Sequence, residues 1–275
     1  MVTHSYHNNV TLITGASSGI GEALAYELAG QGACLALAAR RVESLEAVAA
    51  RCRELGGQAV AIRADISQQT DCERLVQETI EAYGRLDTLV NNAGITMWAR
   101  FSDLNDPALI EQIMKVNFLG AMYCTYYALP YLQQHEGRIA NISSMADKLI
   151  TPGNTGYVAS KHAMEGFFEA LRAEVAEAGV SVTMLYLGFV DTGFAGRMLD
   201  KEGKVSSGIA AQLWQTKQMS PADSARLIAR ATYQRKRTVY THVDGWPGWI
   251  FPWFKLLMPR YLEKIGKGFM DAGGI

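Results

Sequence analysis

Short apolar runs alternate along the chain with longer stretches in which apolar residues recur every three to four positions. The apolar runs are predicted to be strands and cover residues 10–14, 34–39, 58–63, 86–90, 138–142, 180–186 and 238–241. The periodic stretches are predicted to be helices and cover residues 19–31, 42–55, 68–83, 107–134, 157–178 and 221–235. Strands that are apolar at almost every position are typical of a parallel sheet with helices on both faces. The alternation therefore predicts a doubly wound α/β fold, with seven parallel strands joined by right-handed crossovers in one domain, 1–275.

Two segments fit neither period. Residues 188–219 carry five glycines among apolar side chains and follow a predicted strand, so we predict a mobile lid at the ligand-binding edge of the sheet. The aromatic C-terminal segment 245–275 begins with a stretch, 245–259, that holds three of the five tryptophans. This stretch is too short and too interrupted by prolines to span a bilayer. Three uses stay open for it: covering the ligand pocket, packing against a partner subunit, or lying in a membrane interface.

Composition and charge exclude several classes of protein. Of the 275 residues 49% are hydrophobic, and the net charge is -1, which excludes a disordered chain and gives no reason to expect nucleic acid as a partner. The four cysteines lack C-x2-C spacing, so we expect reduced, buried thiols and no metal site. The first residues lack the features of a signal peptide, which favours a cytoplasmic protein. The uncharged run 116–132 contains polar residues and is predicted to be a buried or interface helix.

A glycine-rich turn follows the first predicted strand and opens the first helix. Its sequence, Thr14-Gly15-Ala16-Ser17-Ser18-Gly19-Ile20-Gly21, has G-x3-G-x-G spacing. Glycines let the backbone approach a ligand closely, and the free N–H groups of a helix N-terminus bind phosphate. The turn is therefore predicted to hold a dinucleotide, with a helix-packing turn as the alternative. The residues expected to contact the cofactor here are Gly15, Ser17, Ser18, Gly19, Ile20 and Gly21.

The end of the second predicted strand bears on which dinucleotide binds. An acid about 20 residues beyond the glycine turn usually holds a free ribose 2′-OH, but this chain has Arg40 and Arg41 there. Guanidinium groups suit a 2′-phosphate, so the arginines favour NADP(H) over NAD(H) unless they only cap the next helix. Asp65, at the end of the third strand, is either an acceptor for the adenine amino group or a loop residue.

Three further polar motifs follow later strands. Asn91-Asn92-Ala93-Gly94 comes after the fourth strand, Ser143-Ser144 after the fifth, and Tyr157 and Lys161 lie in the next helix. Because the carboxyl ends of parallel strands meet at one edge of a sheet, we expect these groups to lie close together. Tyr157 and Lys161 are one helical turn apart, so the ammonium is expected to lower the pKa of the phenol and make it an acid/base near neutral pH.

In this order the motifs resemble those of the short-chain dehydrogenases/reductases, a family with a Rossmann-like fold. The resemblance spans roughly residues 8–192, and the two arginines fit an NADP-preferring member. It implies that Tyr157 is the catalytic acid/base and that Ser144 hydrogen-bonds the substrate oxygen. It also implies that Lys161 holds the nicotinamide ribose and that Asn117 positions a water in the proton relay, unless Asn117 only makes an ordinary buried hydrogen bond. The residues that would contact the cofactor are Asn91, Ala93, Gly94, Tyr157, Lys161, Val190 and Thr192.

The chain departs from the family pattern at two places. Leu187-Gly188 stands where the family usually has Pro-Gly, which puts the path into the lid in doubt. Asp147 stands where a glycine commonly follows the serine segment, which puts the floor of the substrate pocket in doubt. Neither departure removes a predicted catalytic group.

The expected surroundings of the reacting group are mostly apolar. Candidates for the substrate pocket, besides Ser144 and Tyr157, are Met97, Trp98, Met145, Leu149, Phe189, Phe194, Met198, Leu213 and Trp214. They favour a bulky hydrophobic ketone, aldehyde or alcohol of steroid, retinoid or long-chain type, although some of them could only pack the lid.

The sequence thus predicts an NADP(H)-dependent oxidoreductase that interconverts a carbonyl and a secondary or primary alcohol, in the reducing direction. A homodimer or homotetramer is expected, because the helices 107–134 and 157–178 resemble those that pair between subunits in this family. The alternatives are a catalytically silent NADP(H)-sensing regulator and a reductase of small polar carbonyls. Peripheral membrane contact through 245–259 stays open.

Overall fold

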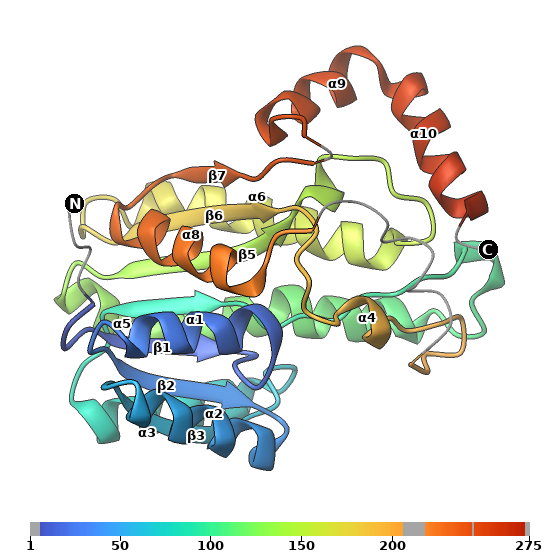
Figure 1. The fold of residues 1–275 in the computed structure, drawn as a ribbon. Helices are drawn as coiled ribbons and strands as arrows, with labels where there is room; N and C mark the ends of the chain where they lie inside the picture. Colours follow the sequence, from blue (N-terminus) through green and yellow to red (C-terminus); the bar gives the residue numbers. More distant parts are fainter. Residues whose placement is uncertain (1–5, 206–217, 244, 273–275) are drawn as a thin grey trace.

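Seven parallel strands form the sheet at the centre of the molecule. The computed structural model describes residues 6–205, 218–243 and 245–272. Within these residues the strands are β1 (Val10–Thr14), β2 (Cys34–Ala39), β3 (Gln58–Arg63), β4 (Thr88–Asn91), β5 (Arg138–Ser144), β6 (Ser181–Leu187) and β7 (Thr238–Tyr240). Their spatial order is β3-β2-β1-β4-β5-β6-β7, and every neighbouring pair is parallel (Figure 1). The predicted doubly wound fold is confirmed, and its strand order reverses between β1 and β4, where such folds bind ligands.

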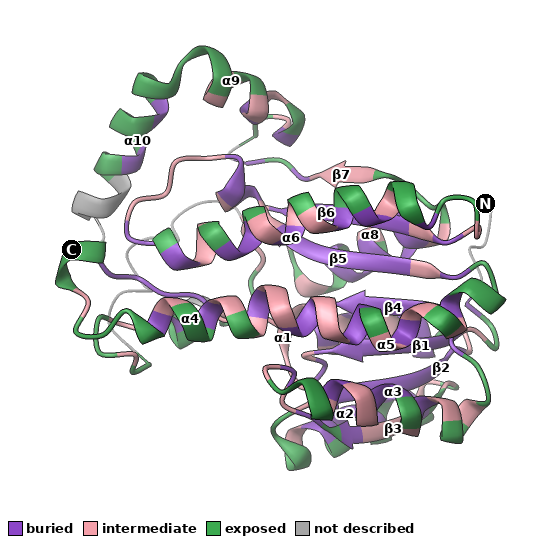
Figure 2. Cartoon of the chain, turned by 180° about the vertical axis from the view of Figure 1, so that it is seen from behind, coloured by how far each residue is buried: buried purple, intermediate pink, exposed green. Residues whose placement is uncertain are grey.

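Helices cover both faces of this sheet, as the near-continuous apolar strands require. The main helices are α1 (Gly19–Ala29), α2 (Val42–Glu54), α3 (Gln69–Tyr83), α4 (Ala108–Met114), α5 (Gly120–Gln134), α6 (Thr155–Glu174), α8 (Pro221–Tyr233), α9 (Phe251–Leu257) and α10 (Pro259–Ala272). Buried side chains of α3, α5 and α6 pack in one core cluster, and those of α1, α2 and α8 pack in another. Figure 2 shows both layers, with buried strands between helices whose outer surfaces are exposed. The four cysteines are buried free thiols, as predicted.

The predicted helix 107–134 is divided into three pieces. A π-helical turn, Lys115–Leu119, separates α4 from α5, although the backbone stays right-handed helical at the junctions on both sides. Such single turns hold one residue more than an α-helical turn and are frequent at functional sites. This turn carries Asn117. Among residues 6–205, 218–243 and 245–272, no helix is both long and apolar enough to cross a membrane.

The C-terminal segment contains two helices that the sequence pattern did not predict. We call residues 245–272, which include α9 and α10, the C-terminal arm. Pro252 lies in the first turn of α9 and Pro259 begins α10. In a first turn the missing proline N–H removes no helical hydrogen bond, so these prolines start helices instead of breaking one. The arm projects from the end of β7 over the edge of the sheet (Figure 1).

Candidate active site

A large cavity lies at the carboxyl ends of the strands. Its volume is about 1220 Å³, and it is bordered by the loops that follow β1 to β6 and by the C-terminal arm. The predicted site residues that line it are Gly15, Ser17, Ser18, Gly19, Ile20, Arg40, Arg41, Asp65, Ala93, Gly94, Ser144, Met145, Tyr157, Lys161, Val190 and Thr192. Residues distant in the sequence are thus brought to one place by the parallel topology.

The glycine turn is built for close backbone contact. Gly15 has φ of +68°, and a Cβ atom there would lie 2.7 Å from the Cα of Ala93. A Cβ at Gly21 would lie 2.5 Å from the carbonyl oxygen of Gly15, so Gly21 packs α1 against the turn and does not line the cavity. Ser18, the N-cap of α1, makes no side-chain capping bond among the described contacts. The first N–H groups of α1 therefore keep their capacity to bind a phosphate, which fits a dinucleotide.

The structure corrects the prediction for Asn91. Its side-chain amide is buried and donates to Thr125 Oγ1 at 3.1 Å and to Asn141 Oδ1 at 2.9 Å, and it is not among the residues that line the cavity. The next residue, Asn92, lines the cavity instead. Its side-chain nitrogen donates to the carbonyl oxygen of Thr14 at 2.9 Å and to that of Gly15 at 3.2 Å. Asn92 therefore ties the loop after β4 to the glycine turn.

Three arginines line the adenosine end of the cavity suggested by the glycine turn. Arg41 donates to Ser17 Oγ at 3.4 Å, and Arg40 precedes it at the end of β2. Arg197, which the sequence analysis did not select, lies close enough for the charge of Arg41 to act on it: burial lowers the pKa of Arg197, and Arg41 lowers it further. Like charges that approach one another in this way favour an anionic ligand between them.

Asp65 lies at the cavity, and its predicted contact with the adenine amino group stays a prediction. It lines the cavity, but its Oδ1 accepts hydrogen bonds from the backbone nitrogen and the hydroxyl of Ser67, at 3.1 and 2.8 Å. The loop after β6 reaches the glycine turn on the other side, because Gly19 packs against the side chain of Thr192. Thr192 Oγ1 in turn donates to the carbonyl oxygen of Val190 at 3.4 Å.

Ser144, Tyr157 and Lys161 meet in the middle of the cavity. Ser144 ends β5, and its hydroxyl hydrogen-bonds the phenol of Tyr157. Tyr157 lies in the first turns of α6, and Lys161 lies one turn later. The Lys161 ammonium lies 5.6 Å from the centre of the Tyr157 ring and donates to the carbonyl oxygen of Ile142 at 2.8 Å. Strand β5 and helix α6 therefore fix all three groups relative to one another.

The predicted lowering of the Tyr157 pKa is not found. Burial raises the pKa of Tyr157 to about 12, with the hydrogen bond from Ser144 lowering it and the charge of Asp147 raising it. Burial also lowers the pKa of Lys161 to about 8, against an opposing effect of Asp147. The helical spacing placed the two side chains correctly, but the loss of hydration on burial has the largest effect on both pKa values. In this state the hydroxyl keeps its proton.

Asn117 is fully buried, and both polar atoms of its side chain are hydrogen-bonded. Its Nδ2 donates to the carbonyl oxygen of Ile95 and to Ser160 Oγ, both at 2.9 Å, and its Oδ1 accepts from Ile95 N at 2.8 Å. Asn117 does not line the cavity, but a Cβ on Gly94 would lie 3.4 Å from its Oδ1 and 4.0 Å from Lys161 Nζ. The side chain therefore holds the loop after β4 against α6.

The apolar wall differs from its prediction at one position. Trp98, Met145, Leu149, Phe189, Phe194 and Met198 line the cavity. Met97 does not, because it is fully buried in a small cluster with Ala99, Leu109 and Ile113. The rings of Phe194 and Tyr157 are 6.5 Å apart. Leu213 and Trp214, and with them residues 206–217 of the predicted lid, lie outside the described residues.

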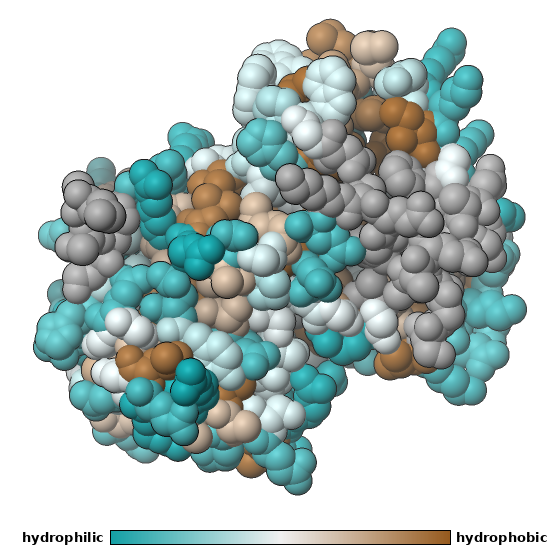
Figure 3. Space-filling view, viewed as in Figure 1, coloured by the Kyte–Doolittle hydropathy of each residue, from teal (hydrophilic) through white to brown (hydrophobic). Residues whose placement is uncertain are grey.

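The C-terminal arm supplies wall residues that the sequence analysis did not name individually. Its side chains on the cavity are Trp246, Phe251, Phe254, Met258, Tyr261, Leu262 and Ile265. Apolar side chains gather on the arm in the space-filling view (Figure 3). The sequence signal that could have predicted these wall residues is the helical spacing of the apolar side chains in α9 and α10.

Of the two departures from the family pattern, Leu187-Gly188 lines the cavity and Asp147 does not. The N–H of Gly188 donates to Thr241 Oγ1 at 2.7 Å, and a Cβ there would lie 2.9 Å from the carbonyl oxygen of His242. Gly188 thus packs against the end of β7. Asp147 is fully buried behind the cavity and does not line it.

Comparison with known proteins agrees with this geometry. The family model for short chain dehydrogenase matches residues 9–203. The chain belongs to the short-chain dehydrogenase/reductase family. It is 39% identical over 267 residues to 11-beta-hydroxysteroid dehydrogenase A of Sesamum indicum, covering 93% of this chain and 74% of that protein. It is also 39% identical over 269 residues to 11-beta-hydroxysteroid dehydrogenase 1A of Arabidopsis thaliana, covering 95% and 75%.

Solved structures of this family share the fold. A dehydrogenase/reductase from Sinorhizobium meliloti 1021 superposes with a TM-score of 0.76 at 30% identity, covering 88% of this chain and 96% of that one. An alcohol dehydrogenase from the archaeon Thermococcus sibiricus, complexed with 5-hydroxy-NADP, gives 0.74 at 26% identity, covering 86% and 96%. As a member of this family the protein is an oxidoreductase that acts on a hydroxyl or carbonyl group with a nicotinamide cofactor. No cluster of metal-binding side chains occurs in the described part of the chain.

Proposed function

We propose that this short-chain dehydrogenase/reductase is an NADP(H)-dependent enzyme that reduces a hydrophobic ketone or aldehyde to the alcohol. The observation that carries the proposal is the meeting of Ser144, Tyr157 and Lys161 in the same cavity as the uncapped glycine turn. A nucleotide-sensing regulator has no need of this trio, which argues against that alternative.

Positive charge at the end of β2 supports the preference for NADP(H). Arg40 and Arg41 stand where an acid would hold a free 2′-OH, and Arg197 adds a third guanidinium on the same cavity. A dianionic 2′-phosphate gains charge-assisted hydrogen bonds from such groups. The Thermococcus neighbour, which is complexed with an NADP derivative, is consistent with this assignment.

Each residue of the trio has a defined task in the proposed reaction. When bound, the cofactor supplies a hydride to the carbonyl carbon. Ser144 donates a hydrogen bond to the carbonyl oxygen, and Tyr157 gives that oxygen its proton, so that the alcohol forms and a phenolate remains. Lys161 places a positive charge beside this phenolate while it is reprotonated from solvent. Asn117 supports the path of reprotonation by fixing Ile95 and Ser160 beside the catalytic helix.

The character of the cavity supports a bulky hydrophobic substrate. Trp98, Met145 and Phe194 line the cavity together with Tyr157, and the C-terminal arm adds further apolar side chains. A large apolar site with a few converging polar groups binds ligands by shape and burial. Relatives named as hydroxysteroid dehydrogenases fit a steroid-like size.

A graded panel of carbonyl compounds tests the proposal. NADPH absorbance would be followed with ketones and aldehydes that range from small polar sugars to steroid- and retinoid-sized molecules, and each active compound would be repeated with NADH. We expect higher kcat/KM for the large hydrophobic compounds and for NADPH. Faster turnover of small polar carbonyls would reject the substrate class, and preference for NADH would reject the cofactor assignment. Absence of turnover despite tight NADPH binding would favour the sensing regulator.

Of the three uses predicted for the C-terminal arm, covering the ligand pocket is supported by the apolar side chains of the arm that line the cavity. The other two uses, a subunit interface and a membrane interface, stay predictions, as does a homodimer or homotetramer. Sedimentation of the protein alone and with vesicles of anionic and neutral lipid separates them: self-association without vesicles indicates subunit packing, and co-sedimentation with vesicles indicates membrane contact.

A further inference from the structure

The C-terminal arm carries an apolar face that does not belong to the cavity. Four large apolar side chains of α9 and of the turn before it are each at least 60% exposed and are not among the residues that line the cavity. We call them the outer apolar face: Trp249, Trp253, Leu256 and Leu257. The cavity-lining side chains Phe251 and Phe254 lie on the other side of the helix, because successive residues turn by about 100°. A gathered set of exposed apolar side chains marks an interaction surface.

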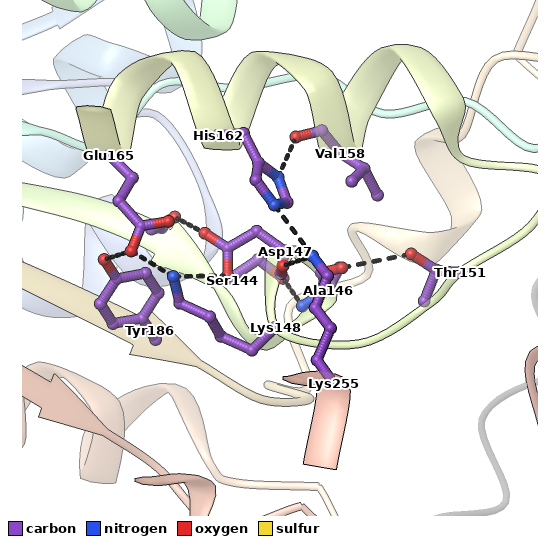
Figure 4. A network of polar contacts seen from close by, with 11 residues as sticks. Ser144, Ala146, Asp147, Lys148, Thr151, Val158, His162, Glu165, Tyr186 and Lys255 are labelled. Carbon is purple, nitrogen blue, oxygen red and sulfur yellow. Dashed lines mark hydrogen bonds and ion pairs between the residues drawn. The ribbon is translucent and has the colours of Figure 1, made fainter. Parts of the chain in front are cut away.

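Contacts with the rest of the protein fix which side of the arm faces outward. A Cβ atom at Gly248 would collide with the backbone just after β7, and one at Gly266 would collide with the loop after β5. Between these two points, Lys255 Nζ donates to the carbonyl oxygen of Asp147 at 3.0 Å and lies 3.1 Å from His162 Nε2 on α6. Figure 4 shows Lys255 reaching from α9 to both groups. The inner side of the arm is therefore occupied by the protein itself, and the outer apolar face points away from it.

Helix α10 adds positive charge to the outer surface of the arm. Arg260, Lys264 and Lys267 are exposed and share one side of the helix, because they are spaced by four and three residues. Leu262 and Gly266 are buried on the opposite side. In sequence the arm holds four basic residues against two acidic ones, whereas the whole chain has a net charge of -1. Positive charge is thus concentrated on the arm.

An anionic lipid bilayer fits this surface better than a second copy of the chain. Helices that lie in a membrane interface combine an apolar side containing tryptophan with lysine and arginine on the polar side. Each such cation adds attraction to an anionic lipid surface. A stable subunit interface takes about 20 to 30 residues a side and is poor in lysine. The outer apolar face has only four side chains and lies beside exposed lysines, so it matches the bilayer on both counts.

Part of the arm also forms the rim of the cavity. Met258, Tyr261 and Ile265 line the cavity and are exposed as well, so they border both the cavity and the solvent. Met258 joins α9 to α10, and the other two residues lie in α10. A bilayer in contact with the arm would therefore lie beside this rim.

We propose that the arm docks on an anionic lipid bilayer, with the outer apolar face among the lipid chains near the headgroups and the cations of α10 at the lipid phosphates. Docking places the cavity rim at the bilayer, so that a hydrophobic carbonyl compound dissolved in the lipid enters the cavity without first crossing water. The docking does not depend on the proposed function, whereas the entry of substrate from the bilayer rests on it.

Co-sedimentation of the full chain with vesicles tests the apolar part of this surface. Vesicles of phosphatidylcholine and phosphatidylglycerol in equal parts are compared with vesicles of phosphatidylcholine alone. We expect the parent protein to bind the anionic vesicles. Trp253→Gln combined with Leu257→Gln should weaken this binding by about 10-fold or more, because buried apolar area is lost. The matched control, Phe101→Gln combined with Tyr126→Gln, removes two similarly exposed side chains outside the arm and should bind as the parent does.

A second variant tests the charge and keeps the test decisive if the apolar variant unfolds. Replacing the three exposed cations of α10 by Gln should weaken binding to the anionic vesicles by about 10- to 100-fold and should change binding to phosphatidylcholine much less. Raising the salt concentration should weaken binding of the parent in the same way. The control removes the same charge from exposed positions outside the arm: Arg51→Gln, Lys115→Gln and Arg226→Gln.

Three results would overturn the docking. The first is a parent protein that stays in solution with anionic vesicles. The second is an equal loss of binding in the arm variants and their controls. The third is a dimer, formed without vesicles, that Trp253→Gln combined with Leu257→Gln dissociates, because the outer apolar face would then belong to a second copy of the chain.

Turnover of a vesicle-dissolved substrate tests the entry from the bilayer. A hydrophobic ketone would be supplied in anionic or in phosphatidylcholine vesicles, and NADPH absorbance would be followed. We expect several-fold faster reduction with the anionic vesicles, and loss of this difference in the two arm variants. Equal rates in both kinds of vesicle, despite binding to the anionic ones, would refute entry from the bilayer. If no carbonyl is reduced under any condition, the proposed function fails, while the binding measurements still decide whether the arm docks on lipid.

Discussion

The floor of the cavity and the arm beside it are held in place by different forces. The floor groups Ser144, Tyr157 and Lys161 stand on β5 and α6 and are fixed by the strand ladder and buried hydrogen bonds. The arm is amphipathic, and residues 246–265 contribute eight of the twelve large hydrophobic side chains that are exposed in the described part of the chain. Its polar attachment to the floor runs through Lys255. Proton transfer needs fixed distances, whereas an apolar wall can vary in shape.

This contrast predicts that changes in the floor alter kcat or pH dependence and that changes in the arm alter KM. The largest effect is expected for Tyr157→Phe, which removes the proton donor and keeps the ring. We expect kcat for carbonyl reduction to fall by about 10²- to 10⁴-fold. The dissociation constant for NADPH, measured by fluorescence, should stay nearly the same. Tyr26→Phe, a change in a tyrosine bonded to Glu22 on α1, is the control, and turnover retained in Tyr157→Phe would remove the phenol from the mechanism.

The next largest effect is expected at the cofactor end of the floor. Arg40→Ala combined with Arg41→Ala should weaken NADPH binding by about 10- to 100-fold, because charge-assisted hydrogen bonds to a phosphate are lost. NADH binding should change much less, and titration calorimetry measures both. The control is Arg51→Ala on α2, which removes an exposed arginine that pairs with Glu54. Equal loss of NADPH and NADH affinity would show that the arginines do not contact the 2′-phosphate.

A smaller effect is expected on stability at Asp147. Burial raises the pKa of Asp147 from 3.8 to about 7, so the folded protein keeps a proton there that the unfolded chain has released. The stabilisation from this proton is fully present below pH 3.8 and is lost as the pH rises through about 7. Asp147→Asn should therefore stabilise the fold by about 1 to 3 kcal/mol at pH 9 relative to the parent, and by less at pH 5. Thermal unfolding at several pH values measures this, and a gain independent of pH would contradict it.

The smallest effect is expected in the arm. Phe254 lines the cavity, and Phe254→Ala should raise KM for large hydrophobic carbonyls by a few-fold, about 1 kcal/mol of lost apolar contact, with little change in kcat. Trp253 is 60% exposed and does not line the cavity, so Trp253→Ala is its neighbour control and should leave KM unchanged. A fall in kcat for Phe254→Ala comparable to that of Tyr157→Phe would break the distinction between floor and arm.

Sequence patterns predicted the sheet and the grouping of the site because both follow from local rules. Apolar runs identify buried parallel strands, and their carboxyl ends must meet at one edge. Which of Asn91 and Asn92 faces the cavity was not predictable in the same way, because successive residues at a strand end point to opposite sides and both are asparagine. The two helices of the arm were not predicted because Pro252 and Pro259 were interpreted as interruptions, although each lies at a helix start.

Burial accounts for the remaining differences. The pKa of Tyr157 depends on how much water the folded chain excludes, and helical spacing carries no information about that. Met97 and Trp98 are both apolar, and only the packing around Leu109 and Ile113 turns Met97 away from the cavity. The contribution of Arg197 likewise depends on a loop that returns to the glycine turn from the far end of the fold.

The π-helical turn Lys115–Leu119 sets a limit on how this region can evolve. One surplus residue rotates everything after it by roughly 100° relative to an uninterrupted α-helix. Deleting a single residue here would restore ideal helical geometry, but it would swing either the Asn117 amide away from Ile95 or the apolar stripe of α5 away from the sheet. Insertions and deletions in this turn should therefore be tolerated less well than substitutions on the exposed side of α5.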